Sequence, residues 1–185
     1  MNTATTATVS LGAVTIGLGI LAWHLTKWWK TGSGGAAKGM PGAGGGGGGG
    51  RDPKALIPLL SSMCLGMIAI TAAGGLIGTA AQFLLNSGSL IGNWSLTAAT
   101  GTVTPEVTRS GLKALSPGGC ALLVIYLVIC TSLWKSGAKI LKGKIAAGVT
   151  SGVMLGLSAG FSGMASVALV TITNTVGDKI TGVVL

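Results

Sequence analysis

Charge is the property that this sequence has least of. Among 185 residues there are 12 basic and 3 acidic side chains, or 8% of the chain, whereas 49% of the residues are hydrophobic. Soluble domains carry roughly 25% charged residues, and so few polar groups could not cover an apolar core of this size in water. We therefore expect the chain to be embedded in a membrane.

The sequence also lacks the groups that most catalytic and metal sites require. His24 is the only histidine, and the three acids, Asp52, Glu106 and Asp178, lie outside the apolar runs. Ion pumps and proton relays need charged groups inside the membrane, metal sites need clustered ligands, and a nucleophilic serine or threonine needs a partner base. We therefore expect no enzyme, no metal site and no cofactor.

Cysteine is scarce as well. Cys64, Cys120 and Cys130 are odd in number, lack CxxC spacing and fall in apolar runs. This pattern indicates neither a disulfide framework nor a zinc site. The three side chains are expected to act as small buried hydrophobic groups.

Four apolar runs define the expected fold. Runs of about 20 residues are the usual mark of membrane-spanning helices, so the sequence predicts an all-α membrane protein with about four transmembrane helices. The first run, from Ala7 to Trp23, gives an N-terminal transmembrane anchor over residues 1–30. The other three belong to a helical membrane domain over residues 55–185, with spans at about 56–85, 118–134 and 145–172.

A cleaved signal peptide is the alternative for the first run. Signal peptides carry positive charge before the apolar region and small residues after it. Here Lys27 and Lys30 come after the run, and the bulky Trp28 and Trp29 stand where cleavage would fall. We therefore expect an uncleaved anchor; if the run is cleaved, three spans remain.

Residues 31–54 form a glycine-rich basic segment between the anchor and the helical domain. Gly44 to Gly50 are seven consecutive glycines, which lose much backbone entropy on ordering, so the segment is expected to be a flexible linker. A phosphate-binding loop would need the pattern G-x-x-x-x-G-K-S/T between a strand and a helix. Arg51, Asp52 and Pro53 follow the glycines instead, and this alternative is rejected.

Residues 86–117 separate the second and third spans and are too polar to cross a membrane. Thr104, Pro105 and Glu106 resemble a helix start, because proline favours the first helical turn. We expect a short helix from Thr104 to about Leu115.

The basic residues flank the apolar runs, and this distribution predicts an orientation. The net charge of +9 is not arranged as a basic stripe interleaved with aromatic side chains, so we do not expect nucleic-acid binding. If all four runs cross, nine basic residues fall on one side of the membrane and three on the other. The positive-inside rule then places the nine in the cytoplasm. The protein is expected in a bacterial cytoplasmic membrane with both termini outside the cytoplasm.

Two sets of residues are expected at the membrane surfaces. Lysines are expected to set the topology, with binding of anionic lipid headgroups as a second interpretation; they are Lys27, Lys30, Lys135, Lys139, Lys142 and Lys144. Tryptophans are expected to anchor the helices at the headgroups; they are Trp23, Trp28, Trp29, Trp94 and Trp134.

A glycine stripe marks the last span. Gly148, Gly152, Gly156 and Gly160 recur every four residues, which places them on one face of a helix. In lipid, such a face lets another helix backbone come close. Gly74 and Gly78 form one further contact of this kind in the second run. The partner is either another helix of the same chain or a helix of a neighbouring copy, and both alternatives remain open here.

The third and fourth runs form a helical hairpin with a basic turn over Lys135–Lys144. In this respect residues 118–172 resemble the pilin subunits of conjugative and type IV secretion systems, which are two-helix hairpins rich in small residues. The resemblance covers under a third of the chain and implies a self-assembling membrane component of a secretion, conjugation or similar envelope apparatus.

Three functions follow from these patterns. The first is a non-enzymatic membrane subunit that self-associates through glycine-striped helices, with membrane lipids and homo-oligomer or membrane-complex partners. The second is a pore-forming or holin-like channel protein. The third is a passive transporter, ranked last because the spans lack polar groups.

Overall fold

The computed structural model describes residues 5–31, 53–72, 74–102, 105–158 and 160–184. Within these ranges the chain forms six α-helices, one short 3-10 helix and two strands, so the expected all-α class is confirmed. The elements in chain order are β1 (Thr5–Ser10), α1 (Leu11–Thr31), η1 (Pro53–Leu56), α2 (Ile57–Ala69), α3 (Gly75–Thr100), β2 (Glu106–Leu112), α4 (Pro117–Ser136), α5 (Lys139–Gly156) and α6 (Phe161–Val184). The predicted linker over residues 31–54 falls mostly outside the described residues.

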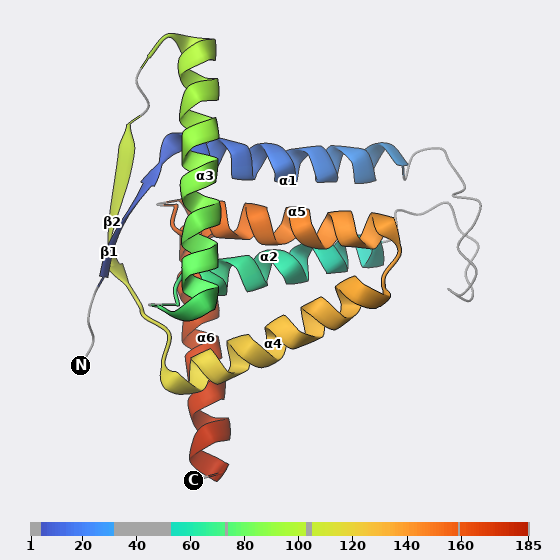
Figure 1. Cartoon of the computed structure of the whole chain (residues 1–185), viewed down its shortest axis with the longest axis vertical. Coiled ribbons are helices and arrows are strands. Elements are labelled where there is room, and N and C mark those ends of the chain that lie inside the picture. Colours follow the sequence, from blue (N-terminus) through green and yellow to red (C-terminus); the bar gives the residue numbers. More distant parts are fainter. Residues whose placement is uncertain (1–4, 32–52, 73, 103–104, 159, 185) are drawn as a thin grey trace.

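Four helices form one layer, and two helices cross it. Figure 1 shows α1, α5, α2 and α4 extending in the same general direction, with α3 crossing one end of this layer in front and α6 crossing it behind. α1 packs against α3 and α5, α2 packs against α5, and α4 packs against α6. α1 and α4 run away from the crossing helices, and α2 and α5 run back toward them.

Two of the expected spans are broken helices. The run over residues 56–85 stops at Ala69 and resumes at Gly75, whose φ of 74° lies in the left-handed region that glycine adopts most easily. The run over residues 145–172 stops at Gly156 and resumes at Phe161 with a bend of 100°. Small residues and glycines at both breaks provide the physical reason for the correction.

The segment between the second and third runs also differs from its prediction. α3 continues to Thr100 and ends at Gly101, which is left-handed and donates its N–H to the Thr97 carbonyl at 2.8 Å. Glu106–Leu112 is a strand, so the expected short helix from Thr104 to Leu115 is wrong. This strand pairs antiparallel with β1, and Val9 stands opposite Val107. Pro105 and Glu106 fit the start of a helix locally, but the pairing of this segment with β1 determines its structure.

The order of elements repeats. One strand followed by three helices gives β1, α1, α2 and α3, and then β2, α4, α5 and α6. The sequence carries the same repeat: Trp29-Lys30-Thr31-Gly32 matches Trp134-Lys135-Ser136-Gly137, and Gly75-Leu76-Ile77-Gly78-Thr79-Ala80 matches Gly160-Phe161-Ser162-Gly163-Met164-Ala165. The chain is therefore built from two similar halves.

Among the described helices, α4 is the one long and apolar enough to cross a membrane by itself. α5 and α6 meet the same criterion only as a bent pair, and Pro53–Ala69 is a shorter apolar segment. The arrangement with four spans therefore stays a prediction.

Candidate helix-packing site

Three glycines of the predicted stripe, Gly148, Gly152 and Gly156, lie against α2 of the same chain. A Cβ atom added to Gly156 would stand 3.2 Å from the Met67 Cα atom, and there is less room at the other two. The residues that the three glycines face are, in order, Leu59 with Ser62, then Met63, and then Met67 with Ile70, the residue that directly follows α2. These glycines therefore make intramolecular contacts.

The remaining glycines predicted for packing have other surroundings. Gly74 and Gly160 lie at the two helix breaks, and an added Cβ would have nothing within 4 Å among the described residues. Gly78 faces the carbonyl of Ala72, in the turn that precedes its own helix. The structure thus brings together Gly148, Gly152 and Gly156 and separates the other three from them.

Gly66 belongs to the same interface and was missed by the sequence analysis. It faces the carbonyl of Val149 on α5, while Gly152 faces the carbonyl of Met63 on α2. The two contacts are equivalent, since each glycine meets the carbonyl three residues before the other. A sequence pattern could have found Gly66, because the repeat that matches Gly75 with Gly160 brings Gly66 within one residue of the position of Gly152.

Two further glycine pairs lie where the crossing helices α3 and α6 contact the layer helices. Gly12 of α1 meets Gly92 of α3, and Gly118 of α4 meets Gly177 of α6, in each case with backbone against backbone. Each pair joins the second residue of a layer helix to the crossing helix of the same half. A side chain at any of these positions would force the helices apart. The sequence analysis did not single out these four glycines.

Hydrogen bonds reinforce the crossing in the second half. The Ser116 hydroxyl accepts the Gly119 N–H at 3.0 Å and donates to Asp178 Oδ1 at 2.7 Å. Asn174 Oδ1 accepts the Ser116 N–H at 2.9 Å, and Asn174 Nδ2 donates to the Ala114 carbonyl at 3.1 Å. Asn174 therefore ties the segment before α4 to α6.

Among the described residues, the equivalent crossing in the first half has fewer hydrogen bonds. The Ser10 hydroxyl accepts the Ala13 N–H at 3.2 Å, as Ser116 does for Gly119. Asn93 follows Gly92 as Asp178 follows Gly177, and its buried Oδ1 has no hydrogen-bond partner among the described residues. The two halves thus share a crossing geometry and differ in its polar contacts.

The predicted lysines gather at the end of the layer away from the crossing helices. Lys27 and Lys30 lie near the end of α1, Lys135 near the end of α4, and Lys139, Lys142 and Lys144 at the start of α5; Figure 1 shows these helix ends on the same side. Lys144 Nζ donates to the Ala55 carbonyl of η1 at 2.8 Å. Glu106 and Asp178 lie at the opposite end, and Asp52 lies outside the described residues.

The predicted tryptophans occupy both ends. Trp29 and Trp134 hold matching positions of the two halves at the lysine end, and both are exposed. Trp23 is exposed further along α1, and Trp28 is half-buried. Trp94 lies on α3, at the opposite end, and is also exposed.

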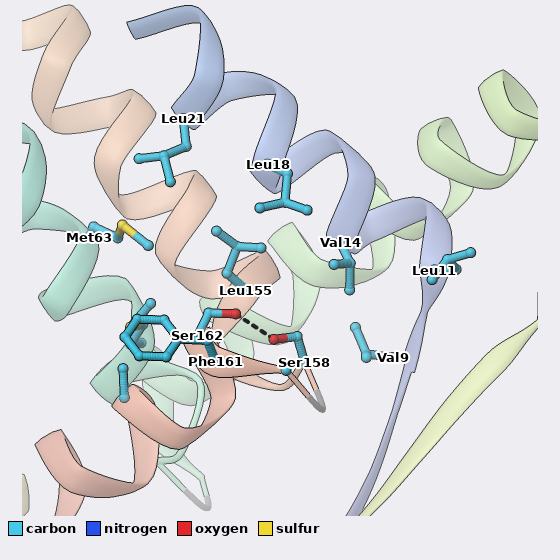
Figure 2. A pocket seen from close by; sticks show the side chains of 13 residues that line it. Val9, Leu11, Val14, Leu18, Leu21, Met63, Leu155, Ser158, Phe161 and Ser162 are labelled. Atoms are coloured by element: carbon cyan, nitrogen blue, oxygen red, sulfur yellow. Dashed lines mark hydrogen bonds between the residues drawn. The ribbon is translucent and has the colours of Figure 1, made fainter. Parts of the chain in front are cut away.

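A cavity of about 520 Å³ opens between β1, α1, α2, α5 and α6. Figure 2 shows its apolar side chains and the hydrogen bond between the hydroxyls of Ser158 and Ser162 at the break between α5 and α6. The described residues that line it are uncharged. The cavity therefore offers apolar contact and no acid–base group.

Acidic, histidine and cysteine side chains are not clustered in the part of the chain that the structure describes. No three His, Cys, Asp or Glu side chains come together there as a metal site would require. Cys64, Cys120 and Cys130 are free thiols on α2 and α4. The described geometry thus consists of packing contacts, a basic end and apolar surface.

Comparison with known proteins adds no relative. No protein-family model, curated protein or solved structure matches this chain.

Proposed function

We propose that this chain is a non-enzymatic integral membrane protein that self-associates as a structural subunit of a secretion, conjugation or similar envelope assembly. The observation that carries the proposal is an apolar outer surface between two polar ends. Bulky residues on α4 expose about half of their surface or more and suit contact with lipid; they are Val124, Ile125, Val128, Ile129 and Leu133.

The layer helices, with their lysine-bearing ends included, are about as long as the hydrocarbon core is thick. At about 1.5 Å per residue, and about 2 Å in the 3-10 helix, α1, η1 with α2, α4 and α5 extend roughly 27 to 32 Å. The hydrocarbon core is about 30 Å thick. These four segments, rather than the longer runs predicted from sequence, are the proposed spans.

The two-half architecture supports the orientation. Each half contributes two of the proposed spans, so both halves start and finish on the same side of the membrane. Duplication of such a unit keeps its basic end on one side, as in transporters with parallel repeats. The lysine end therefore faces the cytoplasm, and both termini lie outside it.

The surface proposed for self-association lies on α1, because α2 covers Gly148, Gly152 and Gly156, the part of the predicted glycine stripe that lies within α5. α1 exposes a face of small residues, which lie within about 60° of one another around the helix at 100° per residue and are Thr15, Gly19, Ala22 and Thr26. Nothing lies within 4 Å of a Cβ added to Gly19. In lipid, a face of this kind favours close helix association.

Native-size analysis in mild detergent tests the proposal. The wild-type protein is expected in the membrane fraction and as a defined oligomer after extraction. Gly19→Leu should reduce the oligomer to smaller species, whereas Val128→Leu on α4 should leave its size unchanged. A monomeric wild-type protein, or an unchanged oligomer in Gly19→Leu, would contradict self-association through α1.

A further inference from the structure

The crossing helices α3 and α6 meet the layer close to one end of the proposed spans. Gly92 of α3 lies on Gly12, and Gly177 of α6 lies on Gly118, which are the second residues of α1 and α4. The inference that follows rests on the proposed membrane location, because it concerns where these two helices lie in the bilayer.

α3 has three distinct faces. The face against the layer is buried and consists of small residues and one leucine: Gly78, Ala81, Leu85, Gly88 and Gly92. The opposite face is an apolar stripe with exposed fractions of 61% to 88%: Leu76, Phe83, Leu90, Ile91 and Trp94. A polar flank lies between these two faces, and its exposed members are Thr79, Gln82, Asn86 and Thr97.

The neighbours of Leu84 fix the direction in which the polar flank faces. Leu84 lines a crevice with Trp134 and Ala146, from the lysine-end halves of α4 and α5. Its side chain therefore points along the layer toward the lysines. Gln82 and Asn86 stand about 200° from Leu84 around the helix, so the polar flank faces away from the lysine end.

α6 repeats part of this arrangement. Leu169, which matches Leu84 in the other half, lines a crevice with Tyr126 and Ile129 of α4. Thr171 and Asp178 lie about 180° to 200° from Leu169 around the helix. α6 also carries an outward apolar stripe that includes Phe161 and Ile172. The outward stripe of α6 also carries the exposed Lys179 near its C-terminal end, and its side away from the lysine end carries the exposed Met164 beside Thr171 and Asp178. α6 therefore repeats the arrangement of α3 only in part.

We propose that α3 and α6 lie in the plane of the membrane, at the lipid headgroup boundary opposite the lysine end. The layer helices stand along the membrane normal, so helices that cross them, such as α6 with its bend of 100° from α5, run close to the plane of the membrane surface. The polar flank then faces water, and the apolar stripe faces the lipid at the side of the protein. An apolar stripe beside a polar flank is the pattern of interfacial helices.

Cysteine accessibility tests this position. In a background carrying Cys64→Ala, Cys120→Ala and Cys130→Ala, single cysteines replace Thr79, Gln82, Asn86 and Thr97 in turn. These four positions span about 27 Å of helix. Intact cells are treated with a membrane-impermeant maleimide. All four are expected to label without permeabilisation, at rates within about threefold of one another, and Phe83→Cys and Leu90→Cys at least about tenfold more slowly.

A control on α4 separates this inference from the proposed membrane location. Ile125→Cys should resist labelling in cells and react after detergent solubilisation. If Ile125→Cys is protected but Asn86→Cys is not labelled while Thr79→Cys or Thr97→Cys is, α3 crosses the membrane and the inference fails alone. Protection of both Gln82→Cys and Phe83→Cys would indicate cover by a second copy and would also overturn it. Rapid labelling of Ile125→Cys would refute the membrane location itself.

Discussion

Gly66 and Gly152 make the same contact from the two sides of one helix interface. Gly66 of α2 meets the Val149 carbonyl of α5, and Gly152 of α5 meets the Met63 carbonyl of α2. α2 and α5 hold equivalent places in the two halves, so this interface behaves like that of a symmetric dimer within one chain. The close backbone contact between α2 and α5 fixes the position of one half of the chain relative to the other.

Methyl groups at this interface should destabilise the fold. Gly66→Ala and Gly152→Ala each place a Cβ against a backbone carbonyl that cannot move aside independently, and overpacking of this kind costs about 1–3 kcal/mol. Unfolding titrations in mixed detergent micelles would measure the loss. Gly143→Ala is the matched control on α5, because nothing lies within 4 Å of its added Cβ. Equal stability of Gly152→Ala and Gly143→Ala would contradict the proposed role of the interface.

The sequence predicted part of this interface. The spacing of Gly148, Gly152 and Gly156 is periodic, so a packing face on one helix could be inferred from the chain alone. α2 contains no second glycine at a spacing of four residues from Gly66, and the role of Gly66 depends on which helix lies opposite. Which helix packs against α2 is determined by the tertiary structure. In the sequence, only the repeat of small residues around the two helix breaks indicates that α5 is the partner.

Loss of the Asn174 side chain should loosen the attachment of α4 to α6. Asn174→Ala leaves the Ser116 N–H and the Ala114 carbonyl without their partner, and such unpaired groups cost about 1–3 kcal/mol. The same unfolding titration would show the loss. Asn86→Ala, on the exposed flank of α3, should change stability little. A loss of similar size in both variants would indicate a general effect of removing an amide.

Tyr126 should hold α4 to α2 by a single hydrogen bond. Its hydroxyl donates to the Ser61 carbonyl at 2.6 Å, so Tyr126→Phe should cost about 0.5–1.5 kcal/mol without altering the packing of the ring. Ser61→Ala keeps the backbone carbonyl and should preserve the bond. Thermal unfolding in detergent would compare the two, and a greater loss in Ser61→Ala would argue against the assigned contact.

The strand β2 shows why local patterns failed elsewhere. Pro105 and Glu106 have the composition of a helix start, yet Val107 pairs with Val9, which lies nearly a hundred residues earlier. The register of two strands so far apart in sequence is not encoded by either segment alone. The all-α fold class and the positions of the lysines could be read from the sequence. The two helix breaks and the pairing of β1 with β2 depend on contacts between residues far apart in the chain.

Removal of lysines from the turn between α4 and α5 should weaken the orientation of the second half. Lys135→Gln, Lys139→Gln and Lys142→Gln together reduce the basic residues on the proposed cytoplasmic side from nine to six, and Lys144 is retained because it bonds to the Ala55 carbonyl. Since basic residues near span ends set topology, a fraction of molecules should expose a C-terminal tag to the cytoplasm. Protease access in intact and opened cells would measure it. Lys113→Gln with Lys179→Gln, at the other end, should not increase that fraction. A wild-type C-terminal tag that is already cytoplasmic would refute the topology from which this expectation follows.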